Sequence, residues 1–305
     1  MLGRGGFGRY TTRPMAQIRV IRRRITAVGT IERITKTMQM IATVKFTTAV
    51  QRAKAAQPYS QKVQQLVGEV VAAAGDLQHP LVDGPPESPK RELLLVISSD
   101  RGFCGAFNAN VLRTAMAHVR QLKQRSTSLD LETSGRKAVG FFRFQRIPIS
   151  QRHTVGDKPS YEQIDQLAHR YILEFSEGKY DAIRVAYMRF ITNARQAPEL
   201  VQLLPLRPDE PESVEAPSAE ALYDFSPSSD EILDDLLPLT VKTALYQAFL
   251  DAAVSEQIMR MVAMKAATEN AGDVRKTLKR KYNRARQAKI TTELMEVISG
   301  AAALE

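Results

Sequence analysis

The residues with the clearest chemical potential form one short block that follows an apolar run. Residues 93–98 are typical of a buried strand, and Ser98-Ser99-Asp100-Arg101-Gly102-Phe103-Cys104-Gly105 leads from it into a predicted helix. A strand-to-helix turn can bind phosphate through backbone N–H groups and the helix dipole. The block lacks the G-x-G-x-x-G spacing of dinucleotide sites and the G-K-S/T ending of a P-loop. We therefore favour a tight turn in which glycines permit unusual backbone angles. An α/β enzyme that uses this turn is kept as an alternative.

Cys104 is the single cysteine of the chain, which excludes an internal disulfide and a cysteine-based zinc site. It could act as a nucleophile, but no catalytic signature surrounds it, so we favour a buried structural thiol. The histidines are scattered without a metal-ligand spacing, and we expect no metal and no cofactor. They are His79, His118, His153 and His169.

Positive charge is concentrated towards both ends of the chain, whose net charge is +10. Residues 1–57 carry twelve Lys or Arg against Glu32, and residues 260–289 carry ten against Glu269 and Asp273. Residues 207–235 are acidic. Such clustering suggests an anionic partner, which could be nucleic acid, lipid headgroups or an acidic protein. No apolar run is long enough to predict a membrane span.

Proline-free windows at the two ends predict two long helices. They lie between Pro14 and Pro58 and after Pro238, and as helices they would span about 65 and about 100 Å. Apolar residues recur in each at three- or four-residue steps, which predicts an antiparallel coiled coil in which each seam buries the other. The predicted seams are Ile18, Ile21, Ile25, Val28, Ile31, Ile34, Met38, Ile41 and Val44, and Leu250, Val254, Ile258, Met261, Met264, Ala271, Val274, Leu278 and Ala285.

The middle of the chain alternates predicted strands and helices. Such alternation favours a central α/β domain with a Rossmann-like, mostly parallel sheet, so the predicted fold class is α/β with a long antiparallel two-helix coiled coil. Strands are predicted at 93–98, 129–133, 147–150, 180–192 and 199–206, and helices at 105–124, 136–145 and 161–177.

The expected organisation therefore has five segments. They are an extension at 1–14, a coiled-coil helix at 15–75, the α/β domain at 76–206, an acidic Pro-rich link at 207–229 and a second coiled-coil helix at 230–305. The extension contains Arg and Thr and no acidic residue, which is compatible with a mitochondrial-type presequence. An overcalled upstream start codon is the simpler interpretation.

Several sequence blocks resemble the gamma subunit of F-type ATP synthases. MAQIRVIRRRI from Met15 and ITKTMQM from Ile34 resemble its opening, and SSDRGFCGAFN (98–108) resembles its central signature. The most specific blocks are SEQIMRMVAMKAATENAG (255–272), YNRARQAKIT (282–291) and SGAAAL (299–304). They occur in the family's order across about 290 residues.

The resemblance implies a non-catalytic subunit, the rotating central stalk that couples ion flow through the membrane sector to ATP synthesis or hydrolysis. Its implied partners are the alpha and beta subunits of the hexameric ring, the epsilon subunit and the membrane c-ring, with no nucleic acid and no direct small-molecule substrate. The implied location is peripheral, on the cytoplasmic face of a bacterial plasma membrane or alternatively on the matrix face of the mitochondrial inner membrane. A basic coiled-coil protein that binds nucleic acid is the alternative that the charge alone suggests.

The resemblance also assigns contact residues by position. Arg286 and Gln287 match an Arg-Gln pair that the family uses against a beta-subunit loop, Met38 matches a Met beside that region, and Lys36 flanks it. The foot segment that meets the membrane ring and epsilon is matched by Tyr223, Asp224 and Phe225. Here Ser226-Pro227 replaces the usual Glu-Pro, which puts one acidic foot contact in doubt.

Overall fold

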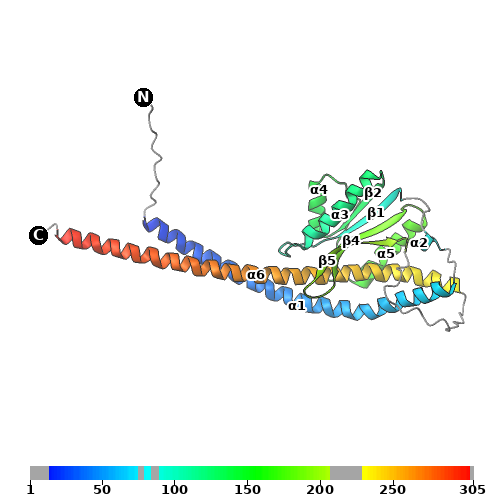
Figure 1. Cartoon of the computed structure of the whole chain (residues 1–305), viewed down its shortest axis with the longest axis horizontal. Coiled ribbons are helices and arrows are strands. Elements are labelled where there is room, and N and C mark those ends of the chain that lie inside the picture. Colours follow the sequence, from blue (N-terminus) through cyan, green and yellow to red (C-terminus); the bar gives the residue numbers. More distant parts are fainter. Residues whose placement is uncertain (1–13, 75–78, 84–88, 207–228, 303–305) are drawn as a thin grey trace, which may run out of the picture. The chain divides into compact units, whose positions relative to one another are not determined.

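The structure is a computed structural model that describes residues 14–74, 79–83, 89–206 and 229–302 (Figure 1). Both long helices continue through a proline, Pro58 in the first and Pro238 in the last. The elements are α1 (Pro14–Ala74), α2 (Pro80–Asp83), β1 (Arg91–Ile97), α3 (Phe107–Gln124), β2 (Ser128–Ser134), α4 (Arg136–Phe144), β3 (Gln151–His153), α5 (Tyr161–Ser176), β4 (Ala182–Phe190), β5 (Gln196–Leu204) and α6 (Ser229–Ala302).

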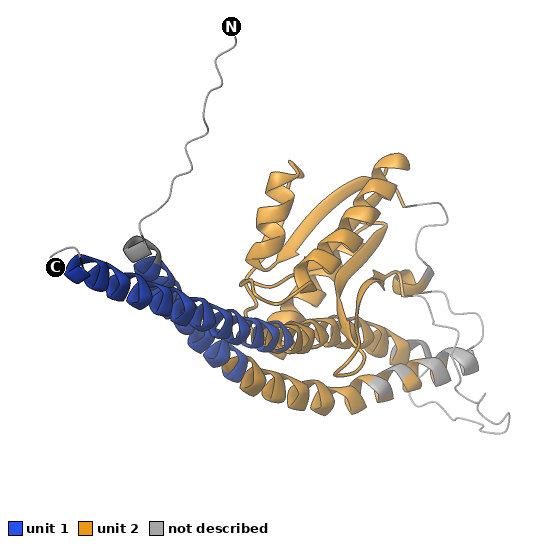
Figure 2. Ribbon diagram, turned by 60° about the vertical axis from the view of Figure 1, so that its left-hand side comes forward, with its two compact units in different colours: residues 1–40, 262–305 blue, residues 41–261 orange. Residues whose placement is uncertain are grey.

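The chain divides into two compact units, coloured separately in Figure 2. The helix-pair unit comprises residues 1–40 and 262–305, and the α/β unit comprises residues 41–261. Each long helix contributes to both units, so the boundary lies within helices rather than in loops.

In the helix-pair unit, α1 and α6 run antiparallel. The Thr268 hydroxyl donates a hydrogen bond to the Thr35 hydroxyl at 2.8 Å. Arg275 Nε lies 3.1 Å from Glu32 Oε2. Residue numbers therefore fall in α1 as they rise in α6, which confirms the predicted antiparallel pairing.

The inward face of α1 departs from the predicted seam after Val28. Ile31 and Ile34 are 52% and 53% exposed, whereas Thr35 is buried. After Val28 the next inward-facing residue is Glu32, four positions on, and not Ile31, three positions on. The predicted spacing of the seam is therefore wrong at this point. The predicted seam residues that lie exposed are Ile31, Ile34, Ile41 and Val44 in α1 and Val274 in α6.

The α/β unit contains a five-stranded sheet in the order β3-β2-β1-β4-β5. β1 is parallel to β2 and to β4, β2 is parallel to β3, and β5 is antiparallel to β4. The predicted mostly parallel sheet is thus confirmed. Leu93, Leu94 and Leu95 of β1 are fully buried, because a central parallel strand is covered by helices on both faces and so forms a continuous apolar run.

The helices cover both faces of this sheet. The chain steps from β1 to β2 to β3 in one direction and then returns to β4 on the other side of β1. Right-handed crossovers therefore place α3 and α4 on one face and α5 on the other. α6 joins the core through Leu233, Leu237, Val241 and Leu245. The reversal of strand order leaves a crevice at the carboxyl ends of the strands, where such folds commonly bind ligands.

The shortest strand was predicted in the wrong place. Residues 147–150 were expected to be extended, but β3 is Gln151–His153. Ile147 is buried against the core as part of the preceding connection. β3 is a polar edge strand that pairs only with β2, so it carries no apolar signal that sequence periodicity could detect.

A buried carboxylate connects β2, β3 and α5. Glu132 accepts hydrogen bonds at 2.7 Å from Arg170 Nη2 and from the Tyr171 hydroxyl, and its Oε2 lies 2.7 Å from His153 Nε2. Burial alone would raise the pKa of Glu132, but the hydrogen bonds from His153, Arg170 and Tyr171 outweigh it and lower the pKa to about 2. Glu132 therefore stays ionised and holds three elements together.

Candidate functional site

The turn that follows β1 uses its own polar groups to satisfy the backbone donors around it. Ser99 N–H donates to Asn108 Oδ1 at 3.0 Å, and Phe107 N–H at the start of α3 donates to the Cys104 carbonyl at 3.2 Å. The first N–H groups of α4 are also taken by this turn, and the Asp100 carboxylate lies where a bound anion would sit. The α4 donor and acceptor pairs are Arg136 N to Asp100 Oδ1, Lys137 N to the Ser99 carbonyl and Ala138 N to Ser98 Oγ.

The turn has the unusual backbone angles that we predicted, although not only at glycines. Gly105 has φ +58°, and Phe103 has φ +62° with 71% of its surface exposed. Gly135, at φ +95°, allows the turn to pack closely on α4, because a Cβ there would lie 2.1 Å from the Ser98 carbonyl oxygen. These contacts support the tight turn over the phosphate site.

Cys104 lies beneath this turn. It is 2% exposed. The amide of Asn108 donates to its Sγ at 3.1 Å, and Ser99 Oγ lies 3.7 Å away. The prediction of a buried structural thiol is confirmed, since a sulfur without solvent access is poorly placed to attack a substrate.

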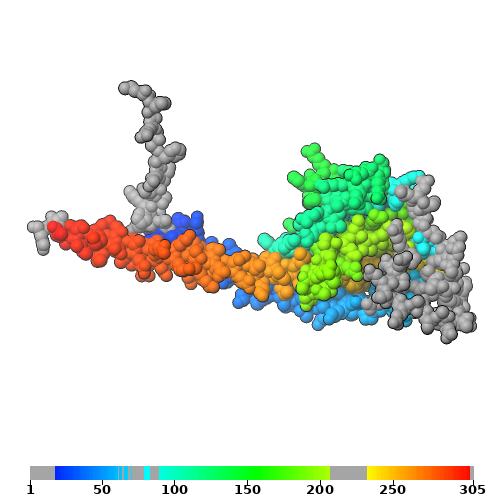
Figure 3. All heavy atoms as spheres, in the orientation of Figure 1, coloured from blue at the N-terminus to red at the C-terminus, as the bar shows by residue number. Residues whose placement is uncertain are grey.

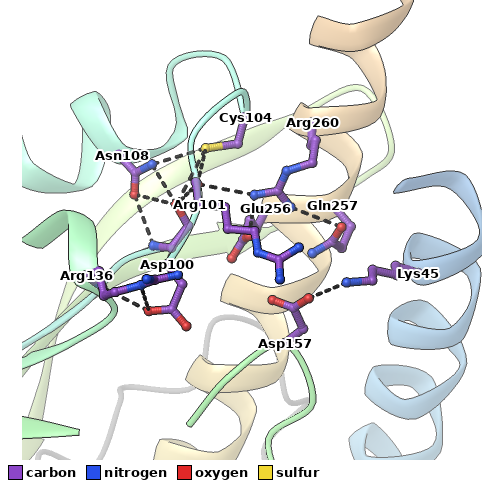
Figure 4. A network of polar contacts seen from close by, with 11 residues as sticks. Lys45, Asp100, Arg101, Cys104, Asn108, Arg136, Asp157, Glu256, Gln257 and Arg260 are labelled. Atoms are coloured by element: carbon purple, nitrogen blue, oxygen red, sulfur yellow. Dashed lines mark hydrogen bonds and ion pairs between the residues drawn. The ribbon is translucent and has the colours of Figure 1, made fainter. Parts of the chain in front are cut away.

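A buried arginine of α6 reaches the same turn (Figure 4). Arg260 Nη2 donates to Glu256 Oε1 at 2.6 Å and to the Arg101 carbonyl at 3.4 Å. Its Nη1 donates to Gln257 Oε1 at 3.1 Å. Burial raises the pKa of Glu256 and the charge of Arg260 opposes that rise. The network joins α6 to the carboxyl edge of the sheet.

An ion pair connects α1 to the loop after β3. Lys45 Nζ donates to Asp157 Oδ2, and Figure 4 shows the two side chains pointing toward one another. Burial would raise the pKa of Asp157, but the bond to Lys45 and the charges of Lys45, Arg260 and Arg101 outweigh it and lower the pKa. Asp157 is therefore an anion at neutral pH that faces cations from three segments.

Two hollows flank this network. A cavity of about 30 Å³ at the strand ends is lined by residues that include Ser98, Gly135 and Glu256, and it has room for little more than water. An open cleft of about 600 Å³ lies beside α1. Its charged lining residues are Lys45, Arg52, Arg101, Arg136, Lys158, Asp100 and Asp157. The enclosed cavity at the strand ends is thus too small for a nucleotide.

His79, His118 and His153 pair with carboxylates rather than with one another. His118 bonds to Glu92, and His79 Nε2 lies 3.2 Å from Asp234. Within residues 14–74, 79–83, 89–206 and 229–302, no group of three or more His, Cys, Asp or Glu could hold a metal ion. Among those same residues, no helix has the length and apolarity to cross a bilayer.

The contact residues assigned by resemblance do not form one patch. Arg286 and Gln287 are exposed on α6, Lys36 is exposed on α1 and Met38 is half-buried. Because Thr35 lies opposite Thr268 in the antiparallel pair, Met38 and Arg286 are separated by roughly 30 Å along the helices. The expectation that Met38 lies beside Arg286 and Gln287 is therefore wrong. The foot residues Tyr223, Asp224 and Phe225 lie outside the described residues.

Sequence reasoning missed the four residues that structure brings together at the sheet edge. Glu256 and Arg260 are four apart on a helix, a spacing that predicts a surface pair but not a buried one. Lys45 and Asp157 are 112 residues apart, and no local pattern could have joined them.

Comparisons with known proteins identify the family. A family model described as ATP synthase matches residues 17–304. An ATP synthase gamma chain from Rhodopirellula baltica is 40% identical over 296 residues, covering 95% of this chain and 100% of that relative. One from Pelotomaculum thermopropionicum is 38% identical with the same coverage. A chain of the Euglena gracilis mitochondrial ATP synthase, in an OSCP/F1/c-ring structure, shares the fold with a TM-score of 0.62 at 18% identity over 95% of each chain. This chain therefore belongs to the ATP synthase gamma-chain family.

Proposed function

We propose that this chain is the rotating central stalk of an F-type ATP synthase, a non-catalytic subunit that couples ion flow in the membrane sector to nucleotide turnover in the alpha/beta ring. The observation that carries the proposal, beside the family itself, is a paired-helix shaft that leaves large apolar side chains exposed. Such surfaces are typical of proteins that work inside an assembly.

The exposed apolar residues lie on both helices of the shaft. In α1, Ile31, Ile34 and Met40 are more than half exposed. In α6 the exposed set extends toward the end of the helix, which Figure 3 shows as an uncovered rod of red and orange atoms. Its members are Ile290, Leu294, Met295, Val297 and Ile298. A surface of this kind supports contact with a ring that encloses the shaft.

The proposed mechanism is mechanical. A stiff helix pair transmits rotation, and an asymmetric surface contacts three identical beta subunits differently at each angle. Each contact shifts the conformation of a beta subunit only by the difference in contact free energy between its states. We assign beta-subunit contacts to Arg286 and Gln287, and to Lys36 and Met38 at a second level of the shaft roughly 30 Å away.

The other proposed partners, beside the alpha and beta subunits, are the c-ring and the epsilon subunit. We assign these contacts to the foot segment Tyr223, Asp224 and Phe225. The complex is membrane-associated, and relatives from bacteria favour the cytoplasmic face of the plasma membrane as its location. The relatives give no support to the nucleic-acid alternative, and exposed Ile, Leu, Met and Val side chains are more typical of a protein interface.

The test begins with affinity purification of the tagged full-length chain from its native cells. Recovery of alpha and beta ATPase subunits is expected, and recovery of nucleic acid without them would overturn the proposal. The double variant R286A/Q287A should then reduce ATP-driven ion pumping relative to ATP hydrolysis. K276A removes a 76% exposed lysine of the same helix and serves as the matched control. Unchanged coupling in the double variant would reject the assigned role.

A further inference from the structure

The carboxyl edge of the sheet is occupied by side chains of the protein's own long helices. In doubly wound folds this edge is the usual ligand site. Here Arg260 of α6 donates a hydrogen bond to the Arg101 carbonyl in the turn after β1. Lys45 of α1 donates one to Asp157 in the loop after β3. The location that other folds use for a ligand is thus a point where both helices meet the α/β region.

Both helices pack into this region. α6 contributes Leu233, Val241 and Leu245 to the core, and α1 contributes Val70 near its C-terminal end. Near the carboxyl edge, α1 touches the sheet through the rings of Phe46 and Phe190, whose centroids lie 6.4 Å apart. The ion pair between Lys45 and Asp157 adds a directional contact beside that apolar one.

Asp157 is the common point of this joint. Its carboxylate accepts a hydrogen bond from the Lys45 ammonium, and the positive charges of Arg260 and Arg101 also stabilise its ionised form. Arg260 is in turn fixed by Glu256 and by the carbonyl of Arg101. The Asp157 carboxylate therefore bonds α1 to the loop after β3, and Figure 4 shows this pair beside the separate Arg260 network of α6.

We infer that Lys45 and Asp157 form a latch that keeps α1 in register with the α/β region, so that the helices and the α/β region turn together under load. The inference rests on the proposed rotor function. Apolar contacts are non-directional, so they resist separation of α1 from the sheet better than they resist sliding. A charge-assisted hydrogen bond has a fixed geometry and opposes sliding. Lys45 and Asp157 are thus positioning residues.

The test is a charge-reversal cycle in the assembled enzyme, reconstituted in vesicles. The variants are K45E, D157K and K45E/D157K, and the readout is ion pumping per ATP hydrolysed. Each single reversal places like charges in contact, and we expect it to lower that ratio at least about threefold. The double reversal restores an opposite-charge pair but places a cation at position 157 beside Arg260 and Arg101, so we expect it to recover only part of the loss caused by D157K. The control pair, Asp273 and Lys276, lies 3.2 Å apart within α6, is exposed and does not involve α1, so D273K/K276D should leave the ratio unchanged.

Three outcomes separate the possibilities. Normal pumping in both single reversals overturns the latch, as does a double reversal that pumps less well than D157K alone. If a reversal prevents assembly, K45Q, D157N and their combination replace it. The combination should then lose no more than either single, because both remove one interaction; additive losses would overturn the latch. A wild-type chain that fails to purify with alpha and beta subunits would instead refute the proposed function.

Discussion

The α/β unit and the helix-pair unit differ in how much they bury. In the α/β unit, Leu93, Phe142 and Ile183 are among many fully buried side chains of one core. Among the described residues of the helix-pair unit, those classed as buried are Thr35, Met264 and Ala271. Since apolar burial is the main favourable contribution to folding, the α/β unit can be stable by itself. The helix pair gains less from apolar burial between its own helices.

Polar contacts are also more deeply buried in the α/β unit than in the helix-pair unit. Glu132 of the α/β unit is almost completely buried, with the side chain 2% exposed, and is bonded to three groups. The pair between Glu32 and Arg275 in the helix-pair unit has side chains that are 22% and 41% exposed. A buried carboxylate that accepts from three groups fixes one arrangement, whereas a partly exposed pair contributes little to the stability of the isolated chain. Buried polar contacts therefore fix the arrangement of the α/β unit more strongly than the exposed pair fixes that of the helix pair.

The largest expected effect on the free energy of unfolding comes from a core substitution in the α/β unit, which we compare with a surface substitution in the helix pair. Phe142→Ala removes a fully buried ring and should lower the free energy of unfolding of the isolated chain by about 3–5 kcal/mol. Ile34→Ala removes a side chain that is 53% exposed and should change it by less than about 0.5 kcal/mol. Urea denaturation followed by circular dichroism measures both. Similar losses in the two variants would contradict the comparison.

A second effect concerns pH. The pKa of Glu132 is about 2 in the folded chain against an ordinary 4.5. A lowered pKa stabilises the fold above about pH 4.5, and that contribution is lost as pH falls from 4.5 toward 2. Glu132→Gln should cost about 2–3 kcal/mol at pH 7, because a neutral amide oxygen accepts more weakly than the carboxylate from Arg170 and Tyr171.

The measurement is a series of urea titrations between pH 7 and pH 3. The difference in stability between wild type and Glu132→Gln should shrink as pH falls below 4.5. Arg275→Gln, in the helix-pair unit, is the reference that should show no comparable convergence. A difference that stays constant across this range would mean that Glu132 is not the group responsible.

The smallest effect tests the exposed pair of the shaft directly. Arg275→Gln breaks the 3.1 Å contact with Glu32 and should lower the stability of the isolated chain by about 0.2–1 kcal/mol, with the loss decreasing at high salt. Denaturation in low and high salt measures it. A loss comparable to that of Phe142→Ala would show that the shaft is specified by its own polar contacts.

Periodicity predicted most of the fold, and its failures occur where burial is incomplete. Residues 161–177 were predicted as a helix, and α5 is Tyr161–Ser176 with its cap at Ser160. The seam of α1 was misplaced after Val28 because its apolar residues exceed what one partner helix can cover. Exposed Ile31 and Ile34 have the same periodicity as a seam. Exposed apolar residues at helical spacing therefore cannot be distinguished from core residues by sequence periodicity alone.

The sequence by itself determined the long helices, the α/β pattern and, through its blocks of family-like residues, the rotor assignment. Those features are local, since they depend on proline placement, residue spacing and short motifs. Only the tertiary structure decided that Asp100 fills the anion position at the start of α4 and that Lys45 meets Asp157 across 112 residues. Contacts between distant segments depend on strand order and on helix register, which are set by global packing and leave no local pattern.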